Sequence, residues 1–131
     1  MPKPAPNAVI IAETHHIHKL DAPSGTAITL ANDIIEELDR KDEWQLRKTV
    51  TEQGTTEAHR RLKKDVLPIT AIREGEVPGI HEVVYDSDVD TLTLRHSAKS
   101  RQGLALGALA AAEFIKGRKG CYTMRDLLLE A

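Results

Sequence analysis

The order of apolar and polar residues along the chain predicts both strands and amphipathic helices. A β-branched run at residues 9–12 is typical of a buried strand that ends near Glu13. Apolar residues then recur at helical spacing from Ala27 to Leu38, and Ser24 stands where the N-cap of such a helix belongs. Further apolar or alternating runs predict three more strands, at residues 67–72, 80–85 and 89–96.

The remaining segments predict surface structure and two more helices. Residues 39–64 are polar and charged, so we interpret them as a surface excursion with only a short strand near residues 48–51. Residues 100–116 predict a second helix, whose apolar face consists largely of small residues. Thr123 followed three residues later by Asp126 is typical of a helix start, which predicts a short terminal helix.

The element order is therefore strand, helix, three strands, helix, helix. Because strands outnumber the helices that could connect parallel strands, the predicted fold class is α+β. We expect a mixed, mostly antiparallel sheet covered on one face by helices, with the last three strands as an antiparallel meander. A length of 131 residues fits one compact domain, so residues 1–131 are expected to form a single domain.

Composition and charge exclude several classes of function. The 18 Lys and Arg against 20 Asp and Glu give a net charge of −2, so no general attraction to nucleic acid or anionic membrane is expected. Cys121 is the only cysteine, which excludes an internal disulfide and a cysteine-based metal site. The Pro-rich residues 2–6 predict an extended lead-in without a signal peptide's apolar core, and the longest apolar stretch, residues 103–112, is too short to span a bilayer. We expect a cytoplasmic protein.

The candidate chemistry is concentrated in residues 13–27, between the end of a predicted strand and the start of a predicted helix. Ligands of open sheets usually bind at that kind of position. Ser24, Gly25 and Thr26 would place hydroxyls and backbone N–H groups at the positive end of the helix, which favours a carboxylate or a phosphate. An isolated Ser-Gly-Thr more often only caps a helix, and its neighbours are what favour a binding role here.

Those neighbours include an amine and imidazoles. Lys19 is a cation and a possible proton donor, while His15 and His16 can donate hydrogen bonds or carry protons near neutral pH. Together with the helix start, they favour a small anionic substrate. A zinc site built on these histidines and His18 is geometrically possible on a strand, but no fourth ligand is evident, so we weigh surface histidines above a metal site.

Two other site types are disfavoured by missing motifs. A Ser-His-Asp hydrolase could be assembled from Ser24, a histidine and Asp21, but the Gly-x-Ser-x-Gly elbow is absent. The glycines form neither Gly-x-Gly-x-x-Gly nor a phosphate-binding loop that ends in Gly-Lys-Ser/Thr. We therefore expect no nucleotide-binding module in this chain.

The residues from Glu13 to Ala27 closely resemble the signature of a known enzyme family. They match the pattern Glu-x-His-His-x-x-Lys-x-Asp-Ala-Pro-Ser-Gly-Thr-Ala at every specified position. Residues 72–82, 96–101 and 124–128 resemble further motifs of the same family. The family is 4-hydroxy-tetrahydrodipicolinate reductase, also called dihydrodipicolinate reductase, and the resemblance covers nearly the whole chain.

The resemblance implies a role for each matching residue. In that family, which serves lysine and diaminopimelate biosynthesis, NADPH or NADH reduces a cyclic imine dicarboxylate. The resemblance implies that His15 is the catalytic donor or acid/base and that Lys19 is the catalytic proton donor. The substrate-binding residues that it implies are His16, Ser24, Gly25 and Thr26.

The resemblance also shows a departure from the family. The N-terminal Gly-x-x-Gly-x-Met-Gly nucleotide fingerprint is absent, so the chain resembles the C-terminal domain alone, without the Rossmann domain and without a cofactor of its own. The resemblance implies that this part binds the dicarboxylate, builds a tetramer through its sheet, and is inactive by itself. In the family, the segment matching residues 100–131 returns to the nucleotide domain, so we expect its small-residue face to need another partner. A non-catalytic oligomerisation module and, less favoured, a histidine-based metal-dependent hydrolase remain as alternatives.

Overall fold

A computed structural model describes residues 8–59 and 61–130 of the chain. The Pro-rich lead-in that the sequence predicts at residues 2–6 lies outside the described residues. Contacts within the chain divide it into two compact units, of which the first ends at Ser97 and the second begins at Ala98. The expectation of one substrate-binding domain stays a prediction.

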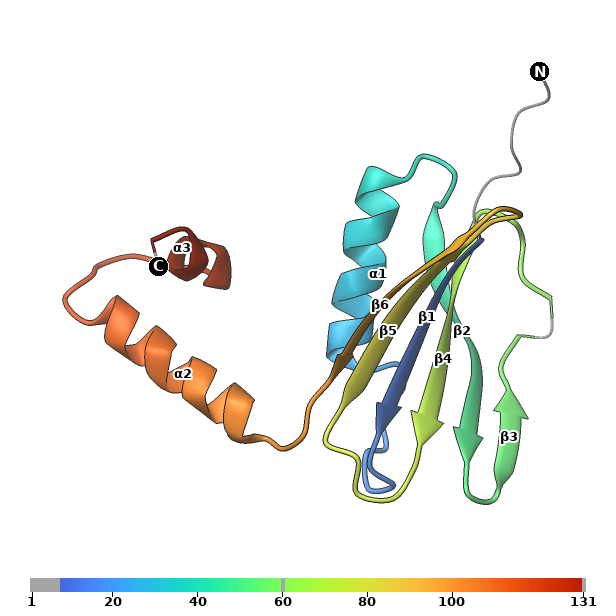
Figure 1. Cartoon of the computed structure of the whole chain (residues 1–131), viewed down its shortest axis with the longest axis horizontal. Helices are drawn as coiled ribbons and strands as arrows, with labels where there is room; N and C mark the ends of the chain where they lie inside the picture. Colours follow the sequence, from blue (N-terminus) through green and yellow to red (C-terminus); the bar gives the residue numbers. More distant parts are fainter. Residues whose placement is uncertain (1–7, 60, 131) are drawn as a thin grey trace. The chain divides into compact units, whose positions relative to one another are not determined.

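The first unit contains, within its described residues, a six-stranded sheet in the order β3-β2-β4-β1-β5-β6 (Figure 1). Its strands are β1 (Ala8–His15), β2 (Glu43–Thr51), β3 (Gly54–Glu57), β4 (Val66–Arg73), β5 (Ile80–Asp86) and β6 (Thr91–Ser97). The inner strand β1 runs parallel to β4 and antiparallel to β5. β2 is parallel to β4, while β3 and β6 are antiparallel to their neighbours. The predicted α+β class with a mixed, mostly antiparallel sheet is confirmed.

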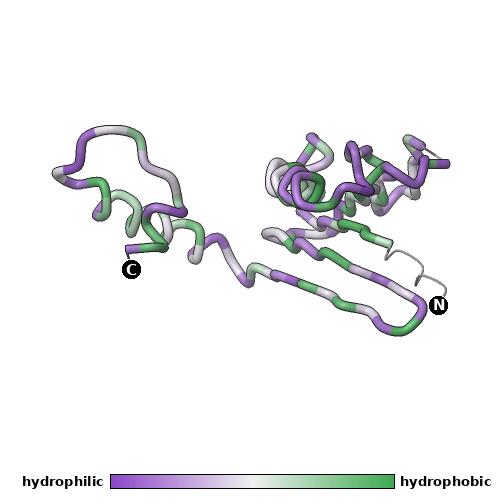
Figure 2. The backbone as a smooth tube through the Cα atoms, turned by 90° about the horizontal axis from the view of Figure 1, so that it is seen from above, coloured by the Kyte–Doolittle hydropathy of each residue, from purple (hydrophilic) through white to green (hydrophobic). Residues whose placement is uncertain are grey.

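One face of this sheet is covered by helix α1 (Gly25–Glu37), as both views show (Figures 1 and 2). Alternation along the inner strands directs every second apolar side chain toward the helix. The buried core consists of Val9, Ile11, Ala27, Ala31, Leu67, Ile69 and Val83. The two alanines let the helix approach the sheet closely, and each fully buried Ile or Leu stabilises the fold by about 1.5–3 kcal/mol.

The signature segment connects the carboxyl end of β1 to the start of α1. β1 ends at His15 and α1 begins at Gly25, so residues 16–24 form the connection between them. Because β4 is parallel to β1, its last residue Arg73 pairs with His15 at the same edge of the sheet. The signature segment therefore lies beside the end of a strand that follows it by about fifty residues in sequence.

Residues 43–57 form two strands where the sequence predicted mostly surface excursion. β2 is a full strand that pairs with β4, not the short strand expected near residues 48–51. Trp44 packs against the core, but a register shift between Leu46 and Lys48 interrupts the alternation. Because the segment is polar and its alternation is interrupted, the sequence pattern did not predict the full length of β2.

The predicted meander is wrong in its first pairing. β4 and β5 are not neighbours, because β1 lies between them. β5 and β6 form the expected antiparallel hairpin, and its turn is closed by the Ser87 N–H, which donates to the Asp90 carbonyl at 2.9 Å. Alternating apolar residues specify which side chains share a face, but they do not specify which strand lies next to which.

The second unit contains two helices among its described residues, α2 (Gln102–Ile115) and α3 (Met124–Glu130). The expected helix start before α3 is confirmed, since the Thr123 N–H donates to the Asp126 carboxylate at 2.7 Å. In the part of the chain that the structure describes, no helix is long and apolar enough to cross a membrane. No described residue of α2 or α3 is buried, and Leu104 is 71% exposed. The apolar surface of α2 is thus open to contact.

Candidate functional site

Four polar side chains meet on the sheet face that α1 covers. Glu13 and His15 are two residues apart on β1, so both point to this face. Arg73 of β4 lies opposite His15, and His81 of β5 lies opposite Glu13. The strand register therefore brings a carboxylate, a guanidinium and two imidazoles together beside the start of α1.

The Glu13 carboxylate is the centre of this cluster and is fully buried. The Arg73 guanidinium forms an ion pair with it, using Nη1 toward Oε1 and Nη2 toward Oε2. The Ser24 backbone N–H donates to Oε2 at 2.5 Å, and His15 Nδ1 lies 3.2 Å from Oε1. A buried carboxylate is stable only with such partners, and here they come from three different segments.

These partners determine the charge of Glu13. Burial raises the pKa of this carboxyl group, but the hydrogen bonds from Arg73, Ser24 and His15, with the charge of Arg73, outweigh burial. The pKa of Glu13 consequently lies below its usual value, and the group is a carboxylate at neutral pH.

Arg73 also fixes the connection between β1 and α1. Its Nε donates to the Lys19 carbonyl at 3.1 Å, and its Nη2 donates to the Asp21 carbonyl at 2.6 Å. One buried side chain thus satisfies both a carboxylate and two loop carbonyls, which a planar guanidinium with five donors can do. The path of the loop that carries Lys19 is set by this arginine.

The first turn of α1 presents the predicted anion-binding groups. Ser24 is the N-cap, and its Oγ accepts from the Ala27 N–H at 3.2 Å, as the sequence predicted. The same Oγ lies 3.1 Å from His81 Nε2. Gly25 and Thr26 are exposed, and helix geometry gives their N–H groups no intrahelical acceptor. The first turn therefore leaves the N–H groups of Gly25 and Thr26 and the Thr26 hydroxyl for hydrogen bonds to an anion.

The two imidazoles of the cluster are in contact. The rings of His15 and His81 lie 5.1 Å apart in an edge-to-face arrangement. Burial lowers the pKa of His81, and the nearby His15 lowers it further, so His81 is held neutral. Gly79 completes this region, because a Cβ at that position would lie only 3.2 Å from His15 Nε2. The absence of a side chain at Gly79 leaves the room that this ring occupies.

Lys19 and Arg73 line one pocket. The Lys19 Nζ pairs with the Asp21 carboxylate at 3.1 Å, and the pocket has a volume of about 390 Å³. The rest of this pocket is formed by Ile17, Leu20 and Ala22 of the connection and by Thr49, Thr51, Glu52 and Gln53 at the end of β2. The pocket is large enough for a small organic anion. Its charged lining residues are Lys19, which is paired with Asp21, Arg73, which is paired with Glu13, and Glu52.

Three of the predicted site residues thus fall into two groups that share Arg73. His15 and Ser24 belong to the Glu13 cluster, and Lys19 belongs to the pocket. His16 has its ring 5.9 Å from that of His18, and its carbonyl accepts from the Lys19 N–H at 3.2 Å. In residues 8–59 and 61–130, no group of three or more His, Cys, Asp or Glu side chains is placed to hold a metal ion.

Sequence reasoning gave no role to Glu13, Arg73 or His81, although all three stand in the quoted motifs. The available signal was Glu13 itself, because a carboxylate at the end of a buried strand must have partners. Those partners could not be identified from local sequence, since Arg73 is 60 residues from Glu13.

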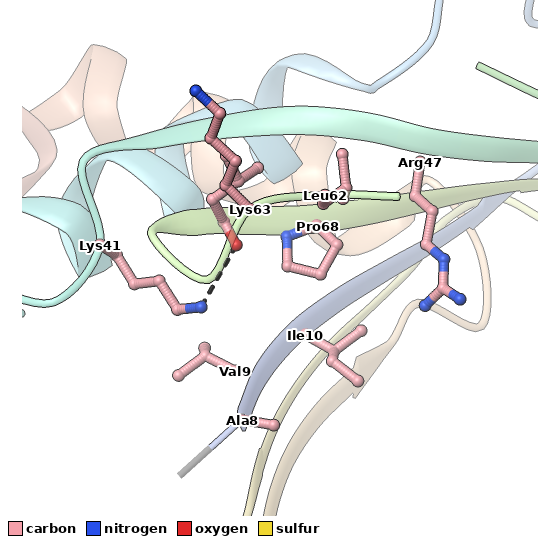
Figure 3. A pocket seen from close by; sticks show the side chains of 9 residues that line it. Ala8, Val9, Ile10, Lys41, Arg47, Leu62, Lys63 and Pro68 are labelled. Atoms are coloured by element: carbon pink, nitrogen blue, oxygen red, sulfur yellow. Dashed lines mark hydrogen bonds between the residues drawn. The ribbon is translucent and has the colours of Figure 1, made fainter. Parts of the chain in front are cut away.

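A second pocket of about 300 Å³ lies at the amino end of β1 (Figure 3). Its lining includes Ile10 and Pro68 together with Lys41, Arg47 and Lys63. The Lys41 ammonium donates to two backbone carbonyls, those of Lys64 at 2.7 Å and Val66 at 3.2 Å. Lys41 therefore stabilises the loop before β4, and none of the signature residues lines this pocket.

Comparisons with known proteins found matches to one enzyme family. The family model described as dihydrodipicolinate reductase, C-terminus, matches residues 2–128. The chain is 46% identical over 121 residues to 4-hydroxy-tetrahydrodipicolinate reductase of Christiangramia forsetii, covering 92% of this chain and 45% of that protein. It is 42% identical over 120 residues to the protein of the same name from Caldanaerobacter subterraneus subsp. tengcongensis, covering 90% and 45%.

A solved structure also matches. It is the dipicolinate-bound dihydrodipicolinate reductase of Paenisporosarcina sp. TG-14, with a TM-score of 0.57 and 32% identity, covering 77% of this chain and 37% of that chain. The chain spans less than half the length of the curated relatives that it matches. Because the family model covers residues 2–128 and the signature lies within them, the chain belongs to the dihydrodipicolinate reductase family and corresponds to its C-terminal part.

Proposed function

We propose that this chain is the substrate-binding and tetramer-forming part of a 4-hydroxy-tetrahydrodipicolinate reductase in lysine and diaminopimelate biosynthesis. The observation that carries the proposal is the start of α1, where Ser24 caps the helix and Gly25 and Thr26 are exposed. A carboxylate fits that turn because N–H groups and the helix dipole converge there. The relative from Paenisporosarcina sp. TG-14 binds dipicolinate, a dicarboxylate, which supports this substrate class.

We propose that Lys19 of the pocket contacts a substrate that carries two carboxylates. Lys19 and Arg73 line the same pocket, and the Lys19 ammonium is held by the Asp21 carboxylate. An ammonium beside a bound dicarboxylate both attracts it and can give it a proton. In the proposed reaction, Lys19 is the proton donor and His15 the donor or acid/base, while His16 contacts the substrate.

The nicotinamide cofactor of such a reductase does not fit this chain. The β1–α1 connection, where a dinucleotide fingerprint would place its glycines, contains Lys19, Asp21 and Pro23. Its inner side is filled by Arg73, which donates to the carbonyls of Lys19 and Asp21. We assign NADPH or NADH to the part of the relatives' length that this chain does not span, and we expect no turnover from this chain alone.

The tetramer is proposed to form through the sheet face opposite α1. By the strand register that face carries Ile80, Glu82 and Val84 of β5 and Thr93 and Arg95 of β6, and Glu82 pairs with Arg95 at 3.4 Å. Figure 2 shows α1 on the other side of the sheet. Sedimentation of the chain across a concentration series is expected to give a tetramer, and a monomer at every concentration would contradict this part of the proposal.

A calorimetric titration with pyridine-2,6-dicarboxylate tests substrate binding directly. The chain is expected to bind this planar analogue saturably without any nucleotide, because the helix start and Lys19 are present in the chain itself. Thr26→Ala is expected to weaken binding at least tenfold, since Thr26 stands in the first turn of α1.

Thr29→Ala is the matched control, because Thr29 is also an exposed threonine of α1 but lies beyond the first turn. It should bind the analogue as the unaltered chain does. Absence of saturable binding, or equal losses in both variants, would contradict a site at the helix start and favour an oligomerisation module.

A further inference from the structure

We propose that Glu13 is a positioning residue that holds His15 in one tautomer, with its ring proton on Nδ1 and a lone pair on Nε2. The tautomer itself follows from the contacts of this chain. Its use in catalysis rests on the proposed function, in which His15 takes part in proton transfer.

The first step concerns the chemical state of Glu13. Arg73 pairs with both carboxylate oxygens, and the Ser24 N–H donates to Oε2. A fully buried group with these donors around it is a carboxylate, which can only accept hydrogen bonds. Since His15 Nδ1 lies 3.2 Å from Oε1, the contact is a hydrogen bond only if Nδ1 carries the hydrogen.

The second step concerns the other ring nitrogen. A neutral imidazole with its proton on Nδ1 has an acceptor lone pair at Nε2. His15 Nε2 lies over Gly79, where any Cβ would come within 3.2 Å, and the His15 side chain is 13% exposed. The ring is thus held by its buried nitrogen, and the opposite nitrogen keeps the role of proton acceptor or, once protonated, donor.

The third step links this ring to the proposed anion site. The carboxylate that bonds His15 also accepts from the N–H of Ser24, the N-cap of α1. The ring and the first turn of the helix are therefore aligned by the same buried group. Such a carboxylate-imidazole pair sets tautomer and orientation in other acid/base sites.

Nitrogen-15 spectra of the full chain labelled at histidine test the assignment, recorded at a pH where the imidazoles are neutral. His15 is expected to show a protonated Nδ1 and an unprotonated Nε2. In Glu13→Gln one of the two oxygens becomes a donor amide, so it cannot accept from Arg73, Ser24 and His15 together. His15 of this variant is expected to lose the Nδ1–H form as its dominant tautomer.

The chain offers a matched control in His18 and Glu76. His18 Nε2 lies 3.3 Å from Glu76 Oε1, but the two side chains are 67% and 80% exposed, so water competes for both partners. Glu76→Gln should leave the His15 signals unchanged. His18 itself is expected to populate both tautomers, in the unaltered chain and in Glu76→Gln.

Two results would overturn the proposal. One is an unaltered chain in which His15 carries its proton on Nε2, a result that stands even if Glu13→Gln does not fold. The other is a folded Glu13→Gln variant that keeps the Nδ1–H form. Titration of the same samples with pyridine-2,6-dicarboxylate separates the two proposals, because failure to bind would contradict the substrate site and leave the tautomer assignment standing.

Discussion

Arginine–glutamate pairs occur in both units of the chain, and their surroundings differ. Glu13 and Arg73 lie within the core of the first unit, with side chains 0% and 5% exposed. Arg118, which follows α2, pairs with Glu130 of α3 in the second unit, and their side chains are 36% and 52% exposed. The buried pair also fixes loop carbonyls and the start of α1, whereas the exposed arginine lies over the ring of Phe114 at 4.1 Å.

The difference between the two pairs reflects which unit encloses a buried core. The first unit encloses a core and places its ionic groups inside it, where removal of one partner is costly. The second unit leaves Leu104 and Leu109 71% and 63% exposed. Its helices are well formed, and they carry exposed apolar side chains.

The largest effect is expected for Arg73→Met. The substitution leaves the Glu13 carboxylate buried without its guanidinium, and it also removes the donors to the Lys19 and Asp21 carbonyls. We expect the free energy of unfolding to fall by about 3–5 kcal/mol. Urea unfolding followed by fluorescence of Trp44, the only tryptophan, measures this directly.

Arg118→Met is the corresponding change in the second unit. Because the Arg118–Glu130 pair is exposed, the Trp44 transition should not move. Equal shifts for the two variants would show that the contrast between the buried and the exposed pair is wrong.

A leucine pair tests the same contrast for apolar side chains. Leu67 of β4 is fully buried. Leu67→Ala should lower the free energy of unfolding by about 3 kcal/mol, because buried apolar surface is lost and a cavity is left behind. Leu109→Ala in α2 removes a side chain that is 63% exposed and should leave the Trp44 transition unchanged. A comparable loss for Leu109→Ala would mean that the apolar face of α2 is covered in solution.

Acid is expected to destabilise the first unit in two steps. The folded pKa of His81 lies below 6.5, so the unfolded chain binds its proton more readily, and stability falls as the pH drops below 6.5. The folded pKa of Glu13 lies below 4.5, so its contribution is complete above that value and is lost as the pH falls through the folded pKa.

Unfolding curves of the first unit across this pH range, read at Trp44, separate the two groups. His81→Gln should remove the step below pH 6.5, and Glu13→Gln should flatten the step below pH 4.5. A chain whose stability is constant from neutral pH to pH 4 would contradict the neutral state assigned to His81.

The smallest of these effects is expected at a helix cap. Ser24→Ala removes the acceptor of the Ala27 N–H and should lower the stability of the first unit by about 1 kcal/mol. Thr123→Ala removes the corresponding group before α3, and the Trp44 transition should not respond to it. If Ser24→Ala lowers the free energy of unfolding by well over the value for an ordinary N-cap, the contact between Ser24 and His81 also stabilises the fold.

Local signals in the sequence predicted what local interactions determine. The strand at 9–12, the helix capped by Ser24 and the start of α3 at Thr123 are all confirmed, because each depends on residues within a few positions. The pairing of β4 was not predictable in the same way. Its partners β1 and β2 are separated from it in sequence, and alternation contains no information about neighbours.

The candidate site also contains residues that local sequence predicts and residues that it does not. The signature located His15, Lys19 and the helix start, since these residues lie within one short segment. The side chains that hold them come from elsewhere, because Arg73 and His81 reach Glu13 only through the register of β4 and β5. Their assignment required the sheet order, which no local pattern specifies.

The position of β1 between β4 and β5 has a consequence for how the chain folds. Neither neighbour is the next strand in sequence, since β4 begins at Val66 and β5 at Ile80. Closing those long loops costs chain entropy before any contact is gained, whereas the β5–β6 hairpin closes locally. In a nascent chain, β1 therefore leaves the ribosome well before β4 and β5 are synthesised, and the strand that carries Glu13 stays unpaired until then.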